Sequence, residues 1–186
     1  MKVMIIGCGR VGARTAAELD RRGEKVTVID DDARAFSRLP SSFGGVTVRG
    51  TGTDEDVLRG AGAELSDVLM ALTEGDNRNA LAAQLGKHTF GIPRVIAKIN
   101  DPLRAEAYRA LGMETICRTV MLSDALVTAA VEGPGSTEFV EAPTAEPLRG
   151  APTPGSLAHA EAQAAIDGDE ADVGAAGAGD GPEEDD

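Results

Sequence analysis

The feature that most constrains this chain is a run of glycines between an apolar segment and a helical one. Gly7-Cys8-Gly9-Arg10-Val11-Gly12 directly follows the apolar residues 2–6 and opens a stretch of helical composition, residues 10–22. In such a strand–turn–helix, the first glycine permits the tight turn. The second lets the backbone approach a pyrophosphate, and the third lets helix and strand pack closely. The motif predicts a βα unit whose helix points its first amides at phosphate groups.

An acidic residue at the end of the next strand agrees with this interpretation. Residues 25–29 alternate and are β-branched, which is typical of a strand, and Asp30 stands 18 residues after Gly12. A carboxylate there accepts hydrogen bonds from an adenosine ribose and repels a 2′-phosphate. Asp31 and Asp32 add negative charge, and Asp32 is a candidate cap for the helix that follows. We expect NAD to be favoured over NADP, with ATP or ADP left open because Asp30 recognises only the ribose.

Strand and helix patterns alternate along residues 1–132. The expected strands are 2–6, 25–29, 45–49, 68–72, 94–99 and 114–117, and the expected helices are 10–22, 33–39, 54–61, 76–88, 103–111 and 120–132. Nearly continuous apolar strands separated by helices predict a parallel sheet covered on both faces. The expected fold class is therefore α/β, a doubly wound, Rossmann-type parallel sheet of six strands.

The acidity of the chain is concentrated near its C-terminal end. The formal net charge is −13, yet residues 1–132 carry 18 acids and 17 bases, whereas residues 133–186 carry 13 acids and one base, Arg149. The second segment is rich in Gly, Pro and Ala and cannot bury enough apolar surface to offset its chain entropy. We expect a nucleotide-binding domain over residues 1–132 and a mostly disordered acidic tail over 133–186. Neither offers a net basic surface, which argues against nucleic acid as a partner.

Composition also bears on location and on cysteine chemistry. No run of about eighteen apolar residues occurs, so no transmembrane helix and no direct membrane insertion are expected. Met1-Lys2 leads straight into the first strand without the pattern of a signal peptide, so a cytoplasmic location is expected by default. Two cysteines, Cys8 and Cys117, form neither a disulfide framework nor a metal site, and we expect two free thiols.

Side chains suited to catalysis are scarce. The one tyrosine, Tyr108, is followed four residues later by Gly112, so the Tyr-x-x-x-Lys arrangement of short-chain dehydrogenases is absent. The two histidines are His88, at a helix end, and His159, in the tail. A dinucleotide site without an acid, a base or a substrate domain favours a sensor over an enzyme. The alternatives are a small NAD-dependent oxidoreductase and a domain that has lost its ligand, and the intact glycine motif with Asp30 argues against the latter.

Several stretches together resemble the TrkA-type RCK (KTN) family of nucleotide-binding domains. The resemblance covers about residues 1–132, and its strongest segments are 1–12, 49–54, 57–62, 67–73, 76–79, 92–98 and 108–113. It implies a cytoplasmic, non-enzymatic regulatory subunit that binds NAD(H), or an adenine nucleotide, and gates a membrane potassium-uptake transporter. Thr51 stands where the family usually has Asp. The tail is too short and acidic for a complete C-terminal RCK domain, although residues 146–150 resemble its start.

The resemblance also implies site residues and an assembly. Because ligands of an open α/β sheet lie beyond the carboxyl ends of its strands, residues at those ends are candidates. Family contacts and position together give the expected cofactor-binding set Gly7, Cys8, Gly9, Arg10, Val11, Gly12, Asp30, Thr51, Thr73, Glu74 and Lys98. Family members pair through a helix after the sixth strand. Residues 120–132 are apolar on more than one face, so we expect a homo-oligomer, at least a dimer, held partly by Leu122 and Leu126.

Overall fold

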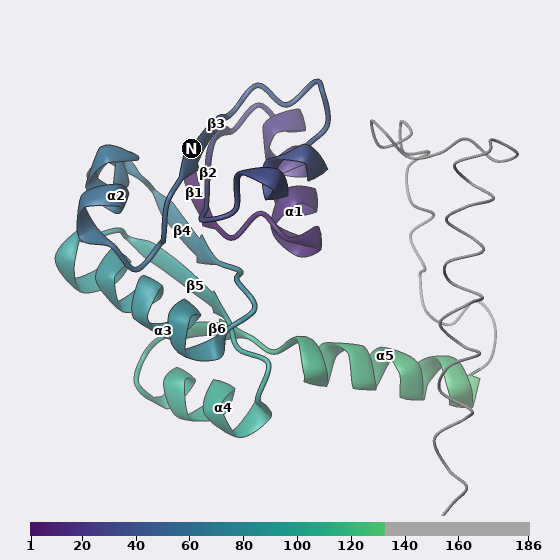
Figure 1. The fold of residues 1–186 in the computed structure, drawn as a ribbon. Helices are drawn as coiled ribbons and strands as arrows, with labels where there is room; N and C mark the ends of the chain where they lie inside the picture. The colour runs from purple at the N-terminus through teal and green to yellow at the C-terminus, as the bar shows by residue number, and fades with distance from the viewer. Residues whose placement is uncertain (133–186) are drawn as a thin grey trace, which may run out of the picture. The chain divides into compact units, whose positions relative to one another are not determined.

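Six parallel strands form one sheet in the computed structural model, which describes residues 1–132 (Figure 1). The strands are β1 (Lys2–Ile6), β2 (Lys25–Asp30), β3 (Val46–Arg49), β4 (Val68–Ala71), β5 (Arg94–Lys98) and β6 (Glu114–Ile116), in the order β3-β2-β1-β4-β5-β6. Every neighbouring pair is parallel. The direction of winding reverses between β1 and β4, which confirms the expected doubly wound, Rossmann-type sheet.

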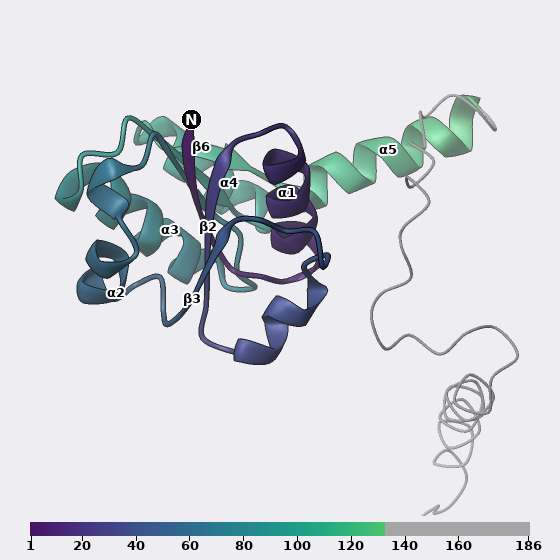
Figure 2. The ribbon, with the colours of Figure 1, turned by 90° about the horizontal axis from the view of Figure 1, so that it is seen from above.

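Helices cover the two faces of the sheet. The helical elements are α1 (Arg10–Arg21), η1 (Ala33–Arg38), α2 (Glu55–Gly60), η2 (Ala63–Leu65), α3 (Asp76–Gln84), η3 (Leu85–Thr89), α4 (Pro102–Ala110) and α5 (Arg118–Glu132). Figure 2 shows α1 on one side of the strands and α2 and α3 on the other. Since successive strand residues point to opposite faces, Ile5 packs with α1 whereas Met4 and Ile6 pack with the other layer. The core is mainly aliphatic on both sides, with Phe90 buried in one layer.

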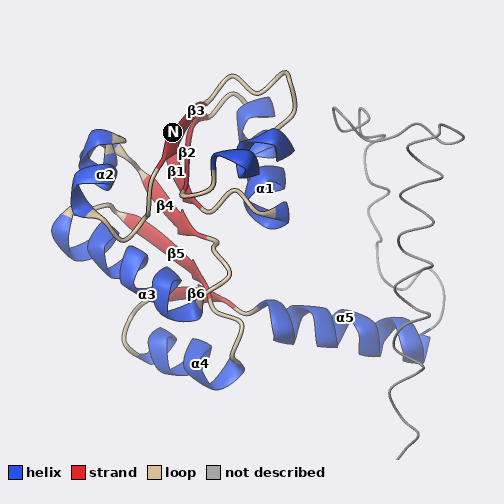
Figure 3. Ribbon diagram, in the orientation of Figure 1, coloured by secondary structure: helices blue, strands red, loops and turns tan. Residues whose placement is uncertain are grey.

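The observed elements follow the expected ones closely, with one short additional 3-10 helix, η2, and two differences in helix type (Figure 3). The segment expected as a helix over 33–39 is the 3-10 helix η1, which Asp32 caps by accepting a hydrogen bond from the Arg34 amide. The helix expected over 76–88 is α-helical to Gln84 and continues as the π-helical turn η3. Gly86 lies in that turn, where a Cβ would meet the Leu69 side chain at 2.9 Å, so the turn packs directly on β4.

The helix after the sixth strand, α5, extends away from the sheet (Figures 1 and 2). None of its residues is buried, and its larger apolar side chains are exposed, for example Leu126 at 60% and Val127 at 62%. Most of the apolar surface of this helix is thus left uncovered by residues 1–132.

The expected tail, residues 133–186, lies outside the described residues. Within residues 1–132, no helix has the length and apolar character that crossing a bilayer requires.

Candidate functional site

A crevice opens at the carboxyl ends of β1, β2, β3 and β4, at the point where the winding reverses. Its volume is about 260 Å³. Such a position is where open α/β sheets bind their ligands. Its lining consists of Ile6, Gly7, Gly9, Ile29, Asp30, Asp31, Asp32, Ala35, Arg38, Gly50, Thr51, Gly52, Thr53, Leu72, Thr73, Glu74 and Arg78.

Six of the eleven expected site residues line this crevice. They are Gly7, Gly9, Asp30, Thr51, Thr73 and Glu74. The other five are adjacent in sequence or space but not part of the lining: Cys8, Arg10, Val11, Gly12 and Lys98. The side chains of Arg10 and Val11 are exposed at the start of α1, while Cys8, Gly12 and Lys98 are buried.

The glycines of the motif differ in what they do. Gly7 has φ +100°, a conformation that favours glycine, and a Cβ there would lie 2.9 Å from the Thr73 amide nitrogen. A Cβ on Gly12 would lie 1.9 Å from the Gly7 carbonyl oxygen, so the folded loop excludes any side chain there. Gly9 has φ −71°, which any residue adopts, and a Cβ there would meet nothing within 4 Å. Folding therefore requires Gly7 and Gly12, whereas the space beside Gly9 stays open towards the crevice.

The first turn of α1 offers free amides next to that open space. Gly9 is the N-cap and has no side chain to accept their hydrogen bonds, and the first turn contains no acidic residue. The first helical bond runs from the Ala13 amide to the Gly9 carbonyl. The earlier amides, of Arg10, Val11 and Gly12, donate to no side chain of residues 1–132. Together with the helix dipole, they make the kind of environment in which an anionic group is stabilised.

The Asp30 carboxylate is held in place at the crevice by two backbone amides. Its Oδ2 accepts a hydrogen bond from the Cys8 amide at 2.6 Å, and its Oδ1 accepts one from the Asp32 amide at 2.9 Å. A carboxylate offers about four acceptor sites, so two remain for a ribose diol. The bond from Cys8 also means that this amide is already used within the loop.

The Cys8 side chain points into the core rather than into the crevice. It is fully buried, and burial together with the Asp30 carboxylate raises the pKa of the thiol to about 11. The thiol stays protonated at neutral pH and is a poor nucleophile. Cys8 and Cys117 are both free, as expected, and Cys117 donates to the Asn100 carbonyl.

A buried amide side chain that the sequence reasoning missed fixes the loop after β4. Asn79 is 0% exposed, and its Oδ1 accepts hydrogen bonds from the Thr73 amide at 2.9 Å and from Thr73 Oγ1 at 2.7 Å. Its Nδ2 donates to the Thr73 carbonyl at 3.0 Å and to the Lys98 carbonyl at 2.7 Å. Asn79 thereby joins the ends of β4 and β5. The sequence signal for a buried asparagine was its position among Ala80, Ala82 and Ala83, the alanines on the buried face of α3.

Lys98, one of the expected cofactor-binding residues, lies largely inside the protein. It is only 5% exposed, at the end of a strand that β4 and β6 flank, and it is absent from the crevice lining. Burial lowers the pKa of its ammonium group below the usual value, while the Glu74 carboxylate acts in the opposite direction.

Hydrogen bonds to Asp76 connect the start of α3 to the residues that follow β5. Its carboxylate accepts hydrogen bonds from the Asn100 amide at 2.8 Å, the Asp101 amide at 3.0 Å and the Asn100 side chain at 3.0 Å. Burial alone would raise the pKa of Asp76, but these hydrogen bonds lower it below the usual value. Asp76 stays ionised and orders the loops at this end of the sheet.

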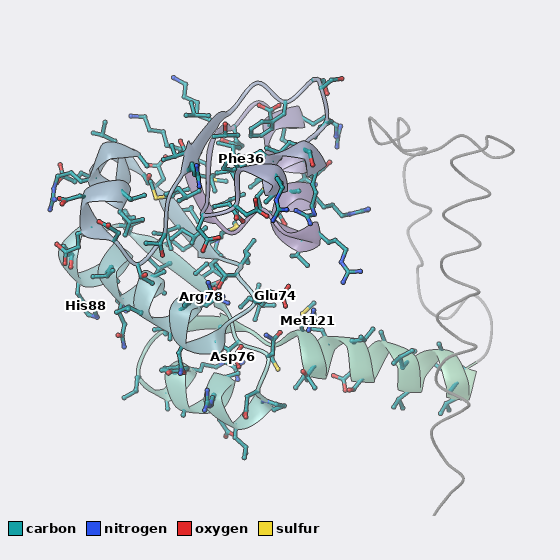
Figure 4. The ribbon with its side chains drawn as sticks, viewed as in Figure 1. Phe36, Glu74, Asp76, Arg78, His88 and Met121 are labelled. Carbon is teal, nitrogen blue, oxygen red and sulfur yellow. The ribbon has the colours of Figure 1, made fainter. Side chains whose placement is uncertain are left out.

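Two arginines at the crevice were also not expected as site residues. Arg38 ends η1, and Arg78 lies in the first turn of α3 and lines the same crevice as Glu74 (Figure 4). Arg78 Nη1 lies 3.9 Å from Asp31 Oδ2. Neither follows from motif spacing, because both reach the site through the packing of distant segments.

Comparison with known proteins gives a consistent family. The family model of the TrkA-N domain matches residues 3–119. The Trk system potassium uptake protein TrkA of Streptomyces coelicolor is 44% identical over 127 residues, which are 68% of this chain and 57% of that protein. The chain thus matches only a little more than half the length of this relative.

Solved structures show the same fold. A structure of GsuK bound to ADP superposes with a TM-score of 0.61 at 24% identity, covering 70% of this chain and 34% of that one. The GsuK channel bound to NAD superposes with a TM-score of 0.57 at 21% identity, covering 68% of this chain and 23% of that one.

Proposed function

Because the chain belongs to the TrkA-N domain family, we propose that it binds NAD(H) in the crevice at the end of β1 and thereby regulates a membrane potassium-uptake transporter. The proposal of nucleotide binding rests on one observation, namely that Gly9 and Asp30 line the same crevice. Gly9 leaves room over the free amides of α1, and the Asp30 carboxylate, held by the Cys8 amide, would accept hydrogen bonds from the ribose. ADP and ATP share these two groups and remain alternative ligands, in keeping with a GsuK structure described as bound to ADP.

The regulatory part rests on the named relative and on the chemistry of the crevice. The relative from Streptomyces coelicolor is a potassium uptake protein of the Trk system. The described lining contains carboxylates and arginines but no histidine, cysteine, lysine or tyrosine, and His88 is exposed on η3. The role would be exercised at the inner face of the membrane through the transporter subunit. Substrate-dependent consumption of NADH by the chain would instead favour the oxidoreductase alternative.

The first prediction concerns the choice between NADH and NADPH. We expect the native chain to bind NADH more tightly than NADPH, because Asp30 accepts from a free ribose hydroxyl and repels a 2′-phosphate. Asp30→Ala should weaken NADH binding by about 1–3 kcal/mol, the range for a hydrogen bond to a charged group. Calorimetric titration of both cofactors measures this.

The control for this prediction is Asp67→Ala. The Asp67 carboxylate also accepts a hydrogen bond from a backbone amide, that of Lys2 at 2.6 Å, but it does so at the amino end of β1, away from the crevice. Its loss removes a comparable carboxylate–amide bond and should leave NADH affinity unchanged. Equal affinities of the native chain for NADH and NADPH would refute the assignment of Asp30.

A second proposal is that α5 joins copies of the chain. Its residues Met121 and Leu126 are 63% and 60% exposed, and none of its residues is buried within one copy. Apolar surface of this extent is uncommon on monomers. We propose a homo-oligomer, at least a dimer, with Leu122 and Leu126 in the interface.

Leu126→Asp should therefore lower the assembly state, because an unpaired charge in an apolar interface is costly. Light scattering at micromolar concentration measures the mass of native and variant chains. Leu65→Asp is the matched control, since Leu65 is a comparably exposed leucine (67%) that lies before β4, away from α5. A native chain that is strictly monomeric would rule the proposal out.

A further inference from the structure

The crevice is poor in positive charge for a site that would hold a diphosphate. Four carboxylates line it, those of Asp30, Asp31, Asp32 and Glu74, against the two guanidinium groups of Arg38 and Arg78. The start of a helix supplies only about half a positive charge. A nearby cation would offset these acids when a diphosphate enters the crevice.

The topology of the sheet distinguishes the two arginines. Arg38 ends η1, the element that follows β2, and its charge acts both on Asp32, at the end of the crevice where the ribose is expected, and on Cys8 of the glycine loop. Arg78 belongs to the first turn of α3, which follows β4, yet its Nη1 lies 3.9 Å from Oδ2 of Asp31, which follows β2. Because β1 lies between β2 and β4, this link passes over the end of β1 and its glycine loop.

Local structure keeps Arg78 in that position without a strong bond. Gly75, the N-cap of α3, leaves room for it, since a Cβ on Gly75 would lie 3.3 Å from Arg78 Nε. The Arg78 and Asp31 side chains are 56% and 66% exposed. Exposed ion pairs contribute little to stability, whereas a guanidinium can form short, paired hydrogen bonds with a phosphate. Arg78 therefore gains by leaving the Asp31 carboxylate and binding a phosphate group instead.

We propose that Arg78 is a phosphate-recognition residue, which leaves Asp31 and binds the diphosphate of the nucleotide held on the glycine loop. The inference rests on the proposed nucleotide site and adds the group that offsets the acidity of its lining. Through Arg78 the bound nucleotide would also contact α3, so that both sides of the crevice would contact the ligand.

The test compares ligands with and without a diphosphate on the full chain. Arg78→Gln should weaken ADP and NADH binding about 10- to 100-fold, the equivalent of a lost charged hydrogen bond, and should leave adenosine binding unchanged. Calorimetry measures ADP and NADH, and NMR titration measures adenosine. Arg21→Gln is the matched control, because it removes another exposed ion pair, with Glu18, at the far end of α1.

A double-variant cycle tests the exchange itself. Asp31→Asn should strengthen ADP binding, and Arg78→Gln should cost more in that background than in the native one, because Arg78 no longer has to leave a carboxylate. Equal ADP affinity in Arg78→Gln and Arg21→Gln would overturn the inference while leaving the nucleotide site intact. An equal loss for adenosine would overturn it too, since Arg78 would then only shape the crevice. Failure of the native chain to bind ADP or NADH would overturn the proposed function itself.

Discussion

Gly9→Val is expected to abolish nucleotide binding and to leave a folded domain. Gly9 has a φ of −71°, which valine adopts, and a Cβ there meets nothing within 4 Å. A valine side chain would therefore occupy the space that a phosphate needs above the first amides of α1. Calorimetric titration with NADH should show no binding, while the thermal unfolding transition stays cooperative.

Two further glycines provide the controls for this result. A Cβ on Gly60, at the end of α2, would also meet nothing within 4 Å, but Gly60 lies outside the crevice lining, so Gly60→Val should keep nucleotide affinity. Gly12→Val should instead fail to fold normally, because its Cβ would lie 1.9 Å from the Gly7 carbonyl oxygen. Normal NADH binding by Gly9→Val would place the phosphate site elsewhere.

Asn79→Ala is expected to cost about 2–4 kcal/mol in the free energy of unfolding, because it leaves several buried polar groups without partners. The side chain is fully buried and makes four hydrogen bonds, three to Thr73 and one to the Lys98 carbonyl. Chemical denaturation followed by circular dichroism measures the loss. Nucleotide affinity should fall as well, since Thr73 lines the crevice.

The neighbouring Asn77 gives a matched comparison for this substitution. It accepts one hydrogen bond from the exposed Arg104 side chain, at 3.1 Å, so Asn77→Ala should change stability by no more than about 0.5 kcal/mol. Similar losses for the two variants would contradict the role assigned to Asn79 in joining β4 to β5.

The parts of the site that the sequence predicted are those that local spacing determines. The glycine motif and Asp30 lie in one βα unit and the strand after it, so their separation along the chain defines where they meet in space. The parallel sheet was predictable for a similar reason, because alternating strands and helices allow few topologies. The helix types of η1 and η3 depend on packing and were not predicted.

The missed residues depend on contacts between distant segments. Arg78 reaches Asp31 only because β4 and β2 flank β1 in the folded sheet, and Asn79 matters because its helix packs over the ends of two strands. Lys98 shows the reverse case, because its place at a strand end suggested a ligand contact whereas packing buries it. Position in the sequence identifies which ends of the strands carry the site, but packing decides which side chains face the crevice.

The measurement that tests the central claim most directly is calorimetric titration of the native chain with NADH, NAD, ADP and ATP, with NADPH for comparison. The proposed site predicts saturable binding of one nucleotide per chain, with NADH bound more tightly than NADPH. Absence of binding by every one of these nucleotides would contradict the proposed site.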